Sequence, residues 1–206
     1  MAFRLAKGTS PWFYVAWAAV AAVAALAYLH SPWWLVLLVP LVVLALIMLN
    51  FFRDPERTPS GEGLLAPADG VVQSIDEWED GRTRVATFMN PFDVHVNRAP
   101  LAGRVTSVTH LEGGFIPAFD KESERNERVV WLFETELGEL EVVQIAGTLA
   151  RRIVPYLEAG AKVAKGDRIG IIRLGSRVDV YLPPGVEPAV SVGDKMVAGE
   201  SVLARI

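Results

Sequence analysis

The sequence contains no cysteine, and this absence removes several kinds of chemistry at once. Disulfide bonds, thiolate nucleophiles and cysteine-ligated metals are excluded, although the redox compartment stays undetermined. Histidine is scarce too: only His30, His95 and His110 occur, with no His-x-His pair and no acidic cluster at metal-ligand spacing. The sequence therefore predicts no metal site, and any nucleophile must be an oxygen or a nitrogen.

Positive charge is not in excess either. The chain has 20 Lys and Arg against 24 Asp and Glu, a formal net charge of −4, and its pI is about 5.5. Proteins that bind the phosphate backbone of nucleic acids normally carry a basic surface, because their affinity comes largely from the release of condensed counterions. Nucleic acid is therefore not expected as a partner.

Apolar residues, in contrast, are abundant: they make up 51% of the chain, and the mean hydropathy is +0.30. The excess lies before residue 53, in two uncharged runs at 12–29 and 33–52. Each run is long enough to cross about 30 Å of hydrocarbon as a helix, and the short break between them favours a helical hairpin over residues 1–52. A single span with an interfacial segment and a cleaved signal peptide are the alternatives.

The charges that flank these runs predict an orientation in the cell membrane. Arg4 and Lys7 precede the first run, Arg53 and Arg57 follow the second, and the break between the runs has no Lys or Arg. Because Lys and Arg are enriched in cytoplasmic flanks, both ends of the hairpin should face the cytoplasm. The domain that follows is then expected on the cytoplasmic face.

The rest of the chain has the pattern of a small β protein. Residues 53–63 are rich in Pro, Arg and Gly and are expected to form a juxtamembrane linker. Within 64–206, polar and apolar residues alternate in several stretches, such as 104–111 and 140–146, and Gly or Pro separates them. This period of two predicts one domain of many short antiparallel strands.

A weak internal repeat points to a particular β architecture. Residues 158–172 overlay residues 191–205, and each copy has the pattern of a strand, a glycine turn and a second strand. The aligned pairs are Gly160 and Gly193, Lys162 and Lys195, and Gly166 and Gly199. This pattern resembles the barrel-sandwich hybrids of lipoyl and biotinyl carriers, so the expected fold class is a mainly β, barrel-sandwich-hybrid-like domain behind a two-helix hairpin.

Three polar residues of the body are candidates for chemistry. His95 lies in the segment Asn-Pro-Phe-Asp-Val-His-Val-Asn-Arg at 90–98, and His110 ends an alternating stretch. Asp69 lies in the turn Ala-Pro-Ala-Asp-Gly at 66–70. Taken alone, each is more often a structural residue, since Asp-Gly is common in turns for conformational reasons.

Gly175 and Ser176 form the most informative position. They interrupt two β-rich runs, where glycine tolerates unusual backbone angles and lets the next hydroxyl approach the glycine carbonyl. The Ser176 Oγ could then attack the Gly175 carbonyl carbon and shift the acyl group from nitrogen to oxygen. By itself, however, a Gly-Ser dipeptide is usually an ordinary turn.

Several of these motifs together resemble one family. Asp69, His95, the Asn-Glu-Arg-Val segment at 126–129 and Gly175-Ser176 occur in the order and approximate spacing of phosphatidylserine decarboxylase proenzymes. Phe-Phe-Arg-Asp-Pro follows the anchor at 51–55. The resemblance covers nearly the whole chain, and its compact length and Gly-Ser-Arg resemble the short branch found in archaea and some bacteria, where archaetidylserine decarboxylases also belong.

The resemblance implies a self-processing enzyme. The chain would cut itself between Gly175 and Ser176 into a β chain (1–175) and an α chain (176–206) that stay associated, and Ser176 would become a pyruvoyl group. His95 would act as general base on the Ser176 Oγ, with Asp69 orienting the imidazole.

The resemblance also implies the substrate and the cofactor. The pyruvoyl carbonyl would form a Schiff base with the serine amine of a phospholipid and accept the electrons released with carbon dioxide, so neither a metal nor pyridoxal phosphate is needed. The implied partners are a membrane phospholipid and the bilayer. The lipid tails, acyl or isoprenoid, and the oligomeric state stay open.

This chain departs from the longer members of the family at two positions. Arg98 stands where they have a second histidine, and it is a candidate for binding the substrate carboxylate or phosphate, with His110 as a further candidate contact. Arg177 stands where they usually have threonine, and its role is left open.

Two other classes of protein fit part of the pattern. A noncatalytic membrane-tethered adaptor would explain the hairpin and the repeat, but gives no reason for Asp69, His95 and Ser176 to occur together. A membrane serine hydrolase would use the same residues but lacks the Gly-x-Ser-x-Gly elbow. The decarboxylase interpretation is therefore favoured.

Overall fold

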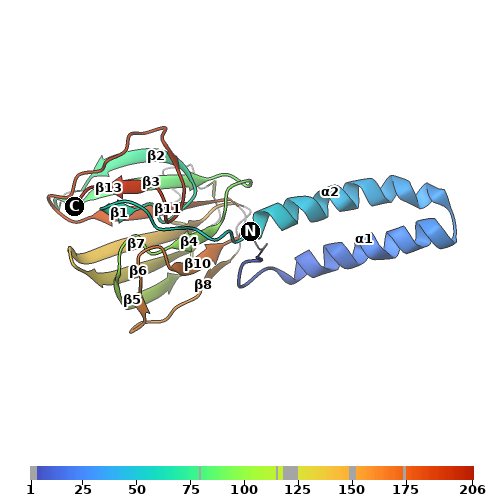
Figure 1. Ribbon diagram of the computed structural model, residues 1–206, viewed down its shortest axis with the longest axis horizontal. Coiled ribbons are helices and arrows are strands. Elements are labelled where there is room, and N and C mark those ends of the chain that lie inside the picture. The colour runs from blue at the N-terminus through green and yellow to red at the C-terminus, as the bar shows by residue number, and fades with distance from the viewer. Residues whose placement is uncertain (1–3, 79, 115, 118–124, 149–151, 174) are drawn as a thin grey trace. The chain divides into compact units, whose positions relative to one another are not determined.

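The computed structural model describes residues 4–206 except 79, 115, 118–124, 149–151 and 174. The chain separates into two compact units, Met1–Pro55 and Glu56–Ile206. Each unit has its own type of secondary structure, helical in the first and β in the second (Figure 1).

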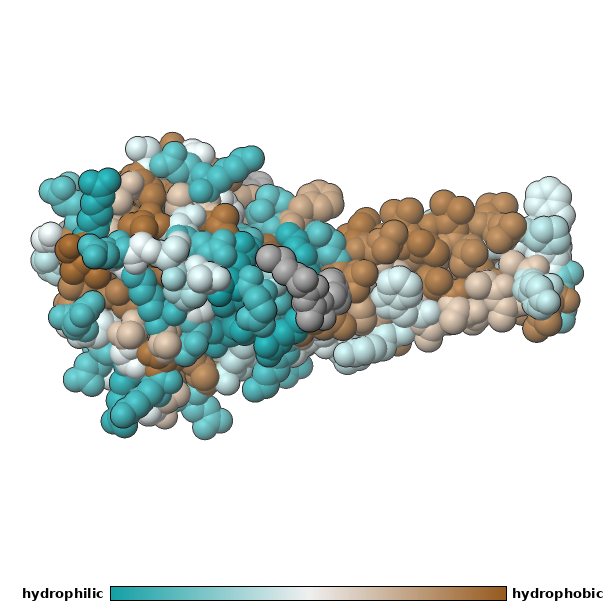
Figure 2. Space-filling model, viewed as in Figure 1, coloured by the Kyte–Doolittle hydropathy of each residue, from teal (hydrophilic) through white to brown (hydrophobic). Residues whose placement is uncertain are grey.

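The first unit contains the two apolar helices that the sequence predicts. These are α1 (Pro11–Leu29) and α2 (Leu35–Phe51), joined through the short 3₁₀ helix η1 (Pro32–Trp34). Both are long and apolar enough to cross a membrane, and apolar side chains cover the visible face of the hairpin (Figure 2). A helix that is apolar on all sides is suited to a lipid or buried environment, so the pair suggests association with a membrane.

The open end of the hairpin is closed by a short antiparallel pairing. Leu5 pairs with Arg53, and the Ala6 N–H donates to the Phe52 carbonyl over 2.8 Å. The Phe52 ring packs edge to face on Phe13 and Phe51. These contacts hold the start of α1 beside the end of α2.

The second unit is mainly β, as the period of two predicts. Its strands are β1 (Leu64–Leu65), β2 (Gly70–Glu77), β3 (Thr83–Met89), β4 (Val96–Arg98), β5 (Gly103–Leu111), β6 (Arg128–Thr135), β7 (Gly138–Ala146), β8 (Ile153–Pro155), β9 (Lys162–Val163), β10 (Arg168–Ile172), β11 (Ser176–Leu182), β12 (Lys195–Met196) and β13 (Val202–Ala204). A curled half-barrel sheet has the order β12-β2-β3-β11-β7-β6-β5-β9, and smaller sheets have the orders β4-β10-β8 and β1-β13 (Figure 1).

One face of the curled sheet carries the hydrophobic core. On β6, the fully buried Trp131 and Phe133 stack with ring centroids 6.1 Å apart. On β11, Val178 and Val180 belong to the same core, because alternate residues of a strand point to one side. Arg177 and Asp179, which alternate with these valines, point to the opposite face and form a buried ion pair there.

The internal repeat is present in three dimensions and is longer than the sequence suggested. Both copies contain the expected strand, glycine turn and strand: β9 and β10 in one copy, β12 and β13 in the other. The Gly166 N–H donates to the Ala99 carbonyl, and the Gly199 N–H donates to the Ala66 carbonyl, each over 2.8 Å.

The Ala-Pro segments at 66–67 and 99–100 therefore belong to the repeat, and they also bond to each other. The Leu65 N–H donates to the Pro100 carbonyl, and the Arg98 N–H donates to the Pro67 carbonyl, over 3.0 and 2.8 Å. The two copies of the repeat thus each bond to one Ala-Pro segment, and the two segments bond to each other. This arrangement is compatible with the barrel-sandwich expectation, which stays a prediction.

Residues 56–61, here called the strap, are bound to the β body, although the sequence suggested a linker. Glu56 pairs with Arg168 over 3.0 Å, and the Gly61 carbonyl accepts from Lys165 Nζ over 3.0 Å. Pro59 packs so closely on Gly166 that a Cβ at this glycine would lie 2.5 Å from the proline ring. The strap therefore covers the glycine turn of the first repeat copy.

Candidate active site at Gly175 and Ser176

Ser176 is the first residue of β11, and it lies opposite the last residues of two neighbouring strands. Its partners are Met89 at the end of β3 and Ala146 at the end of β7, and all three side chains are fully buried. Because Val178 and Val180 point to the core, Ser176 points there as well. The predicted nucleophile therefore faces the interior at one end of the curled sheet.

A chain of buried polar groups leads away from the Ser176 hydroxyl. Ser176 Oγ donates to Met89 Sδ over 3.3 Å, and Asn97 Nδ2 donates to the same sulfur over 3.6 Å. Asn97 Oδ1 accepts from Gln144 Nε2 over 2.7 Å, which joins β4 to the curled sheet. A thioether is a weak acceptor, so this contact positions the hydroxyl without binding it strongly.

Gly175 has the backbone conformation that its residue type permits. Its φ is +70°, in the left-handed region that favours glycine. Its carbonyl oxygen accepts a hydrogen bond from the Gly147 N–H over 2.9 Å, and the Ala146 carbonyl, in the same peptide group as that N–H, accepts from Asn126 Nδ2 over 2.7 Å. The carbonyl that Ser176 would attack is thus already hydrogen bonded.

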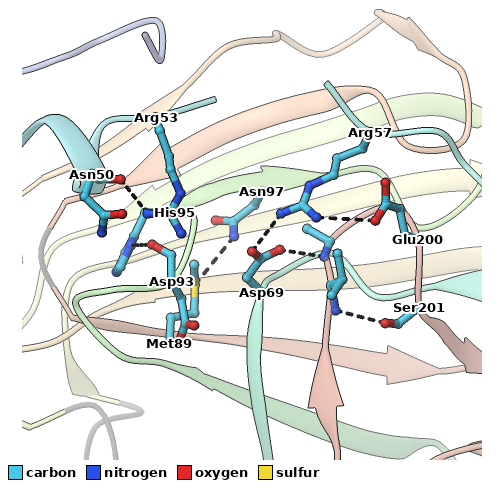
Figure 3. A network of polar contacts seen from close by, with 12 residues as sticks. Asn50, Arg53, Arg57, Asp69, Met89, Asp93, His95, Asn97, Glu200 and Ser201 are labelled. Atoms are coloured by element: carbon cyan, nitrogen blue, oxygen red, sulfur yellow. Dashed lines mark hydrogen bonds and ion pairs between the residues drawn. The ribbon is translucent and has the colours of Figure 1, made fainter. Parts of the chain in front are cut away.

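His95 is fully buried and immediately precedes β4. Its Nδ1 lies 2.9 Å from the Asp93 carbonyl oxygen, which can only accept, so Nδ1 carries the hydrogen and Nε2 is the basic nitrogen of the neutral ring (Figure 3). The His95 carbonyl accepts from the Ile172 N–H over 3.3 Å. This bond places His95 beside the end of β10, a few residues before Gly175.

Asp69 lies among different partners from those expected. One carboxylate oxygen accepts from Arg57 Nη2 over 2.9 Å, and the other accepts from the Ala198 N–H over 2.8 Å (Figure 3). Arg57 also pairs with Glu200 over 3.3 Å. Among the described residues Asp69 is therefore bonded to the strap and to the turn before β13, not to His95, whose Nδ1 is oriented by a backbone carbonyl.

The two candidate substrate contacts, His110 and Arg98, occupy different environments. His110, near the end of β5, is half-exposed, and its Nε2 lies 2.9 Å from Glu127 Oε1. Glu127 is linked in turn to β7, because its carbonyl accepts from the Ala146 N–H over 2.9 Å. Arg98 is buried and donates from Nη1 to the Gly166 carbonyl over 2.9 Å, which is a structural contact within the repeat.

The fold also brings together two arginines that the sequence did not single out. The Arg173 N–H donates to the Arg152 carbonyl over 3.2 Å, and Arg173 stands two residues before Gly175. Burial, and next the positive charge of Arg152, lower the pKa of Arg173. The two residues are far apart in the chain, so no spacing in the sequence could have paired them. Asn126 and Gly147 were likewise brought to the site only by the register of the sheet.

Among the described residues, no group of three or more His, Asp or Glu side chains is placed so that it could hold a metal ion. The groups that do gather at this end of the sheet are a hydroxyl, an amide network and two arginines. Such groups can support acyl transfer at Gly175 and can bind an anion.

Comparison with known proteins connects this arrangement to one family. The profile of the family described as Phosphatidylserine decarboxylase matches residues 44–204. A Phosphatidylserine decarboxylase proenzyme of Thermobifida fusca is 60% identical over 98% of this chain and 93% of its own length, and one of Streptomyces griseus is 59% identical over 98% and 94%. A protein of Halobacterium salinarum, provisionally named an archaetidylserine decarboxylase proenzyme, is 52% identical over 98% of this chain and 100% of its own length.

Proposed function

The chain belongs to the phosphatidylserine decarboxylase family and is a decarboxylase, and we propose that it cuts itself at Gly175-Ser176 and then decarboxylates phosphatidylserine, or its archaetidyl analogue, through a pyruvoyl group made from Ser176. The product would be the corresponding ethanolamine lipid.

The observation that carries the proposal is the geometry of Gly175 and Ser176. A left-handed glycine comes directly before a fully buried serine, and the glycine carbonyl already accepts a hydrogen bond. An ordinary surface Gly-Ser turn would expose the hydroxyl and leave the carbonyl to water. Here the hydroxyl is withdrawn from water and the carbonyl is bonded within the chain, which favours attack within the chain over reaction with an external substrate.

His95 is the base that we propose for the first step. Its Nε2 is the basic nitrogen, and in an extended chain His95 and Asn97 point to the same side. Asn97 reaches Met89, the residue that holds the Ser176 Oγ, so this side faces the nucleophile. Asp69 completes the proposed set, in a position from which it fixes the strap and the turn before β13.

The bonds that change can be stated in order. The Ser176 Oγ forms a bond to the Gly175 carbon as its proton passes to His95, and the Gly175–Ser176 C–N bond then breaks, which leaves an ester. Loss of the Ser176 Cα proton and cleavage of the Cβ–Oγ bond release Gly175 as a carboxylate and leave dehydroalanine. Addition of water to its imine tautomer and loss of ammonia give the ketone.

The surroundings of Ser176 fit a pyruvoyl group. The position is lined by the Met89 thioether and the Ala146 methyl, both fully buried, so a ketone there is protected from hydration. Such a group supplies a carbonyl that takes up the substrate amine and accepts the electron pair from the broken C–C bond. No metal and no pyridoxal phosphate enter the proposal.

The headgroup would be held by charges near this position. Arg152 and Arg173 place two positive charges beside each other, an arrangement suited to a phosphate or a carboxylate. His110, with Glu127, is the proposed contact for the remaining polar part of the headgroup. Arg98 was a candidate for the anion, but its bond to the Gly166 carbonyl favours a structural role.

A lipid substrate lies in a membrane, and the two apolar helices and their flanking charges support a location there. We propose that α1 and α2 anchor the chain in the cell membrane with the β body on the cytoplasmic face, because the positive flanks lie outside both spans. The α chain (176–206) would stay with the β chain (1–175), since β11 is paired on both sides. The β body would be a barrel-sandwich hybrid, for which the two copies of the repeat are the support.

Intact-mass analysis of the purified full chain tests the proposal. Fragments of about 19 and 3 kDa are expected from a 22.5-kDa chain cut in proportion to its lengths, with the smaller fragment blocked to Edman degradation. Ser176→Ala should leave the chain uncut. An active preparation that holds one uncut chain, or a free serine amine at Ser176, would contradict the proposal.

A further inference from the structure

We infer that the backbone N–H of Gly147 is the oxyanion donor of the self-cleavage, and that Asn126 is a positioning residue for the peptide group that carries this N–H. The inference rests on the proposed cleavage at Gly175-Ser176, which supplies the reaction. It gives a role to Asn126, which the motif at 126–129 contains without a role, and to Gly147, which lies outside the motifs.

The donor is in place where negative charge would develop. When the Ser176 Oγ bonds to the Gly175 carbon, the π electron pair of the carbonyl moves onto the Gly175 oxygen, and the Oγ proton passes to His95. The Gly147 nitrogen lies 2.9 Å from that oxygen, within the range of oxyanion donors. When the C–N bond breaks, its electron pair leaves with the Ser176 nitrogen, which takes a proton, and the charge on oxygen returns to the double bond.

Asn126 acts on the other end of the same peptide group. The Ala146 carbonyl and the Gly147 N–H share one planar amide, and Asn126 Nδ2 donates to that carbonyl over 2.7 Å. A hydrogen bond at the oxygen withdraws electron density and strengthens donation from the nitrogen, by about 10–30% per bond in condensed phases. Asn126 touches no reacting atom, so it works through the Ala146–Gly147 peptide.

The surroundings of Asn126 hold its side chain in one orientation. It is fully buried, its Oδ1 accepts from the Ile116 N–H over 3.0 Å, and its Nδ2 also donates to the Ile116 carbonyl over 2.7 Å. These bonds assign the amide orientation, because a flipped side chain would set Nδ2 against an N–H and Oδ1 against two carbonyls. The donor to Ala146 is therefore fixed before any reaction.

The contact at Gly175 continues the pairing of β11 with β7. Ser176 and Ala146 are the last paired residues of the two strands, so Gly175 lies opposite Gly147 in the same register. Gly175 has left the extended conformation, with φ at +70°, and its carbonyl still accepts from the Gly147 N–H over 2.9 Å. The strand pairing therefore holds the donor against the carbonyl up to the bond that would be cut.

The experiment follows cleavage during cell-free synthesis of the full chain with lipid nanodiscs. Loss of the full-length band is timed for wild type, Asn126→Leu, and a chain with glycolic acid at position 147, which replaces the N–H by an ester oxygen. Asp179→Asn is the control for lost stability, because it breaks a buried ion pair and leaves the Asn126 bonds intact. Glycolic acid at the exposed Gly185 is the control for the ester.

Cleavage should be about 100-fold slower with the ester at 147, at the lower end of the range for a lost oxyanion donor, and about 10-fold slower in Asn126→Leu. Both controls should cleave at the wild-type rate. Hydroxylamine, which cuts esters, should release no 176–206 fragment from Asn126→Leu, because the block precedes ester formation. The chain with glycolic acid at 147 is left out of this assay, because its own backbone ester would be cut.

The outcomes separate the inference from the proposed function. If wild type itself stays uncut, the proposed function fails. If wild type is cut and both variants match it, or if the melting temperature and rate of Asn126→Leu merely follow those of Asp179→Asn, the inference is overturned while self-cleavage stands. Release of the 176–206 fragment from Asn126→Leu by hydroxylamine would also overturn it, because the ester at Gly175-Ser176 would then have formed although the positioning residue was missing.

Discussion

The Asp69 carboxylate lies 2.9 Å from the Arg57 guanidinium and not against the imidazole of His95. Arg57 belongs to the strap, and its second nitrogen pairs with Glu200. The acid that the family pattern suggested as a partner of the histidine therefore joins the strap to the turn before β13.

This pairing predicts that Arg57 and Asp69 act as a unit. Asp69→Asn leaves the half-buried Arg57 with one acid, at a cost of about 1–3 kcal/mol. We expect Arg57→Gln to slow self-cleavage about as much as Asp69→Asn, and the double variant to be no slower than either single one. Timed gels of newly made chain measure this.

The matched control is Arg168→Gln, which removes the other ion pair of the strap, with the exposed Glu56. It should cleave at nearly the wild-type rate, since exposed pairs contribute little. If Asp69→Asn blocks cleavage while Arg57→Gln does not, Asp69 acts on the histidine directly and the unit does not exist.

We expect the two histidines of the β body to have different functions, His95 in self-cleavage and His110 in substrate binding. His95→Gln removes the proposed base and should slow self-cleavage by 10²-fold or more, in the range of general-base contributions of about 10²–10⁴. His110→Gln should be cut normally and should instead raise KM for the lipid. Intact mass and steady-state kinetics report the two effects, and normal cutting of His95→Gln would remove this histidine from the proposal.

The pair of arginines should affect the substrate and not the processing. Arg152→Gln removes one of the two neighbouring positive charges and should raise KM for phosphatidylserine about 10-fold, the equivalent of about 1.4 kcal/mol. Self-cleavage should be unchanged. Arg104→Gln, at an exposed position of β5, is the control for a general loss of positive charge. An unchanged KM in Arg152→Gln would place the anion site elsewhere.

The ion pair on the outer face of β11 predicts a stability effect. Arg177 Nε and Nη2 donate to the two Asp179 oxygens over 2.8 and 2.9 Å, and both residues are buried. Asp179→Asn should destabilise the chain by about 3–5 kcal/mol, because it leaves a buried guanidinium without its counter-charge. The double change Arg177→Met with Asp179→Leu should recover most of this loss in denaturant titrations in detergent, and a double variant as unstable as the single one would contradict the argument.

The lowered pKa of Asp76 predicts how the stability of the chain depends on pH. Burial raises its pKa, but hydrogen bonds from Arg84 and Ser74 outweigh that effect, so the pKa lies below its ordinary value of 3.8. A carboxyl with a depressed pKa contributes stability above about pH 4 and loses it as the pH falls through the folded-state value. The stability difference between wild type and Asp76→Asn should therefore be constant near neutral pH and shrink below pH 3.8. A difference that grows in acid would contradict the assignment.

The elements of the fold followed from local patterns in the sequence. The long uncharged runs predicted α1 and α2, and the alternation of polar and apolar residues predicted the β body. Both patterns reflect which faces of an element must be buried. The strand-turn-strand units were visible through Gly166 and Gly199. The Ala-Pro halves of the repeat were not found, since their resemblance is short and appears only through the hydrogen bonds at Ala66 and Ala99.

For the candidate site, the sequence predicts residues more readily than contacts. Gly175, Ser176 and His95 were predicted from motif order, and their roles stay a prediction. The bond between Asn126 and Ala146 depends on the register of β6 and β7, which no local pattern encodes. Asp69 illustrates the same limit. A carboxylate pairs with whichever cation the fold brings close, and here this cation is Arg57.

The position of β11 constrains the order in which the chain can fold and undergo the proposed cleavage. The bond that we propose to be cut begins a strand that is paired with both β3 and β7, so the chain would have to fold as one piece before it is cleaved. If denaturant separated the two fragments, the Gly175–Ser176 bond that first held β11 between β3 and β7 would no longer be there to guide refolding. Maturation would then be a step taken once, and loss of structure afterwards would be permanent.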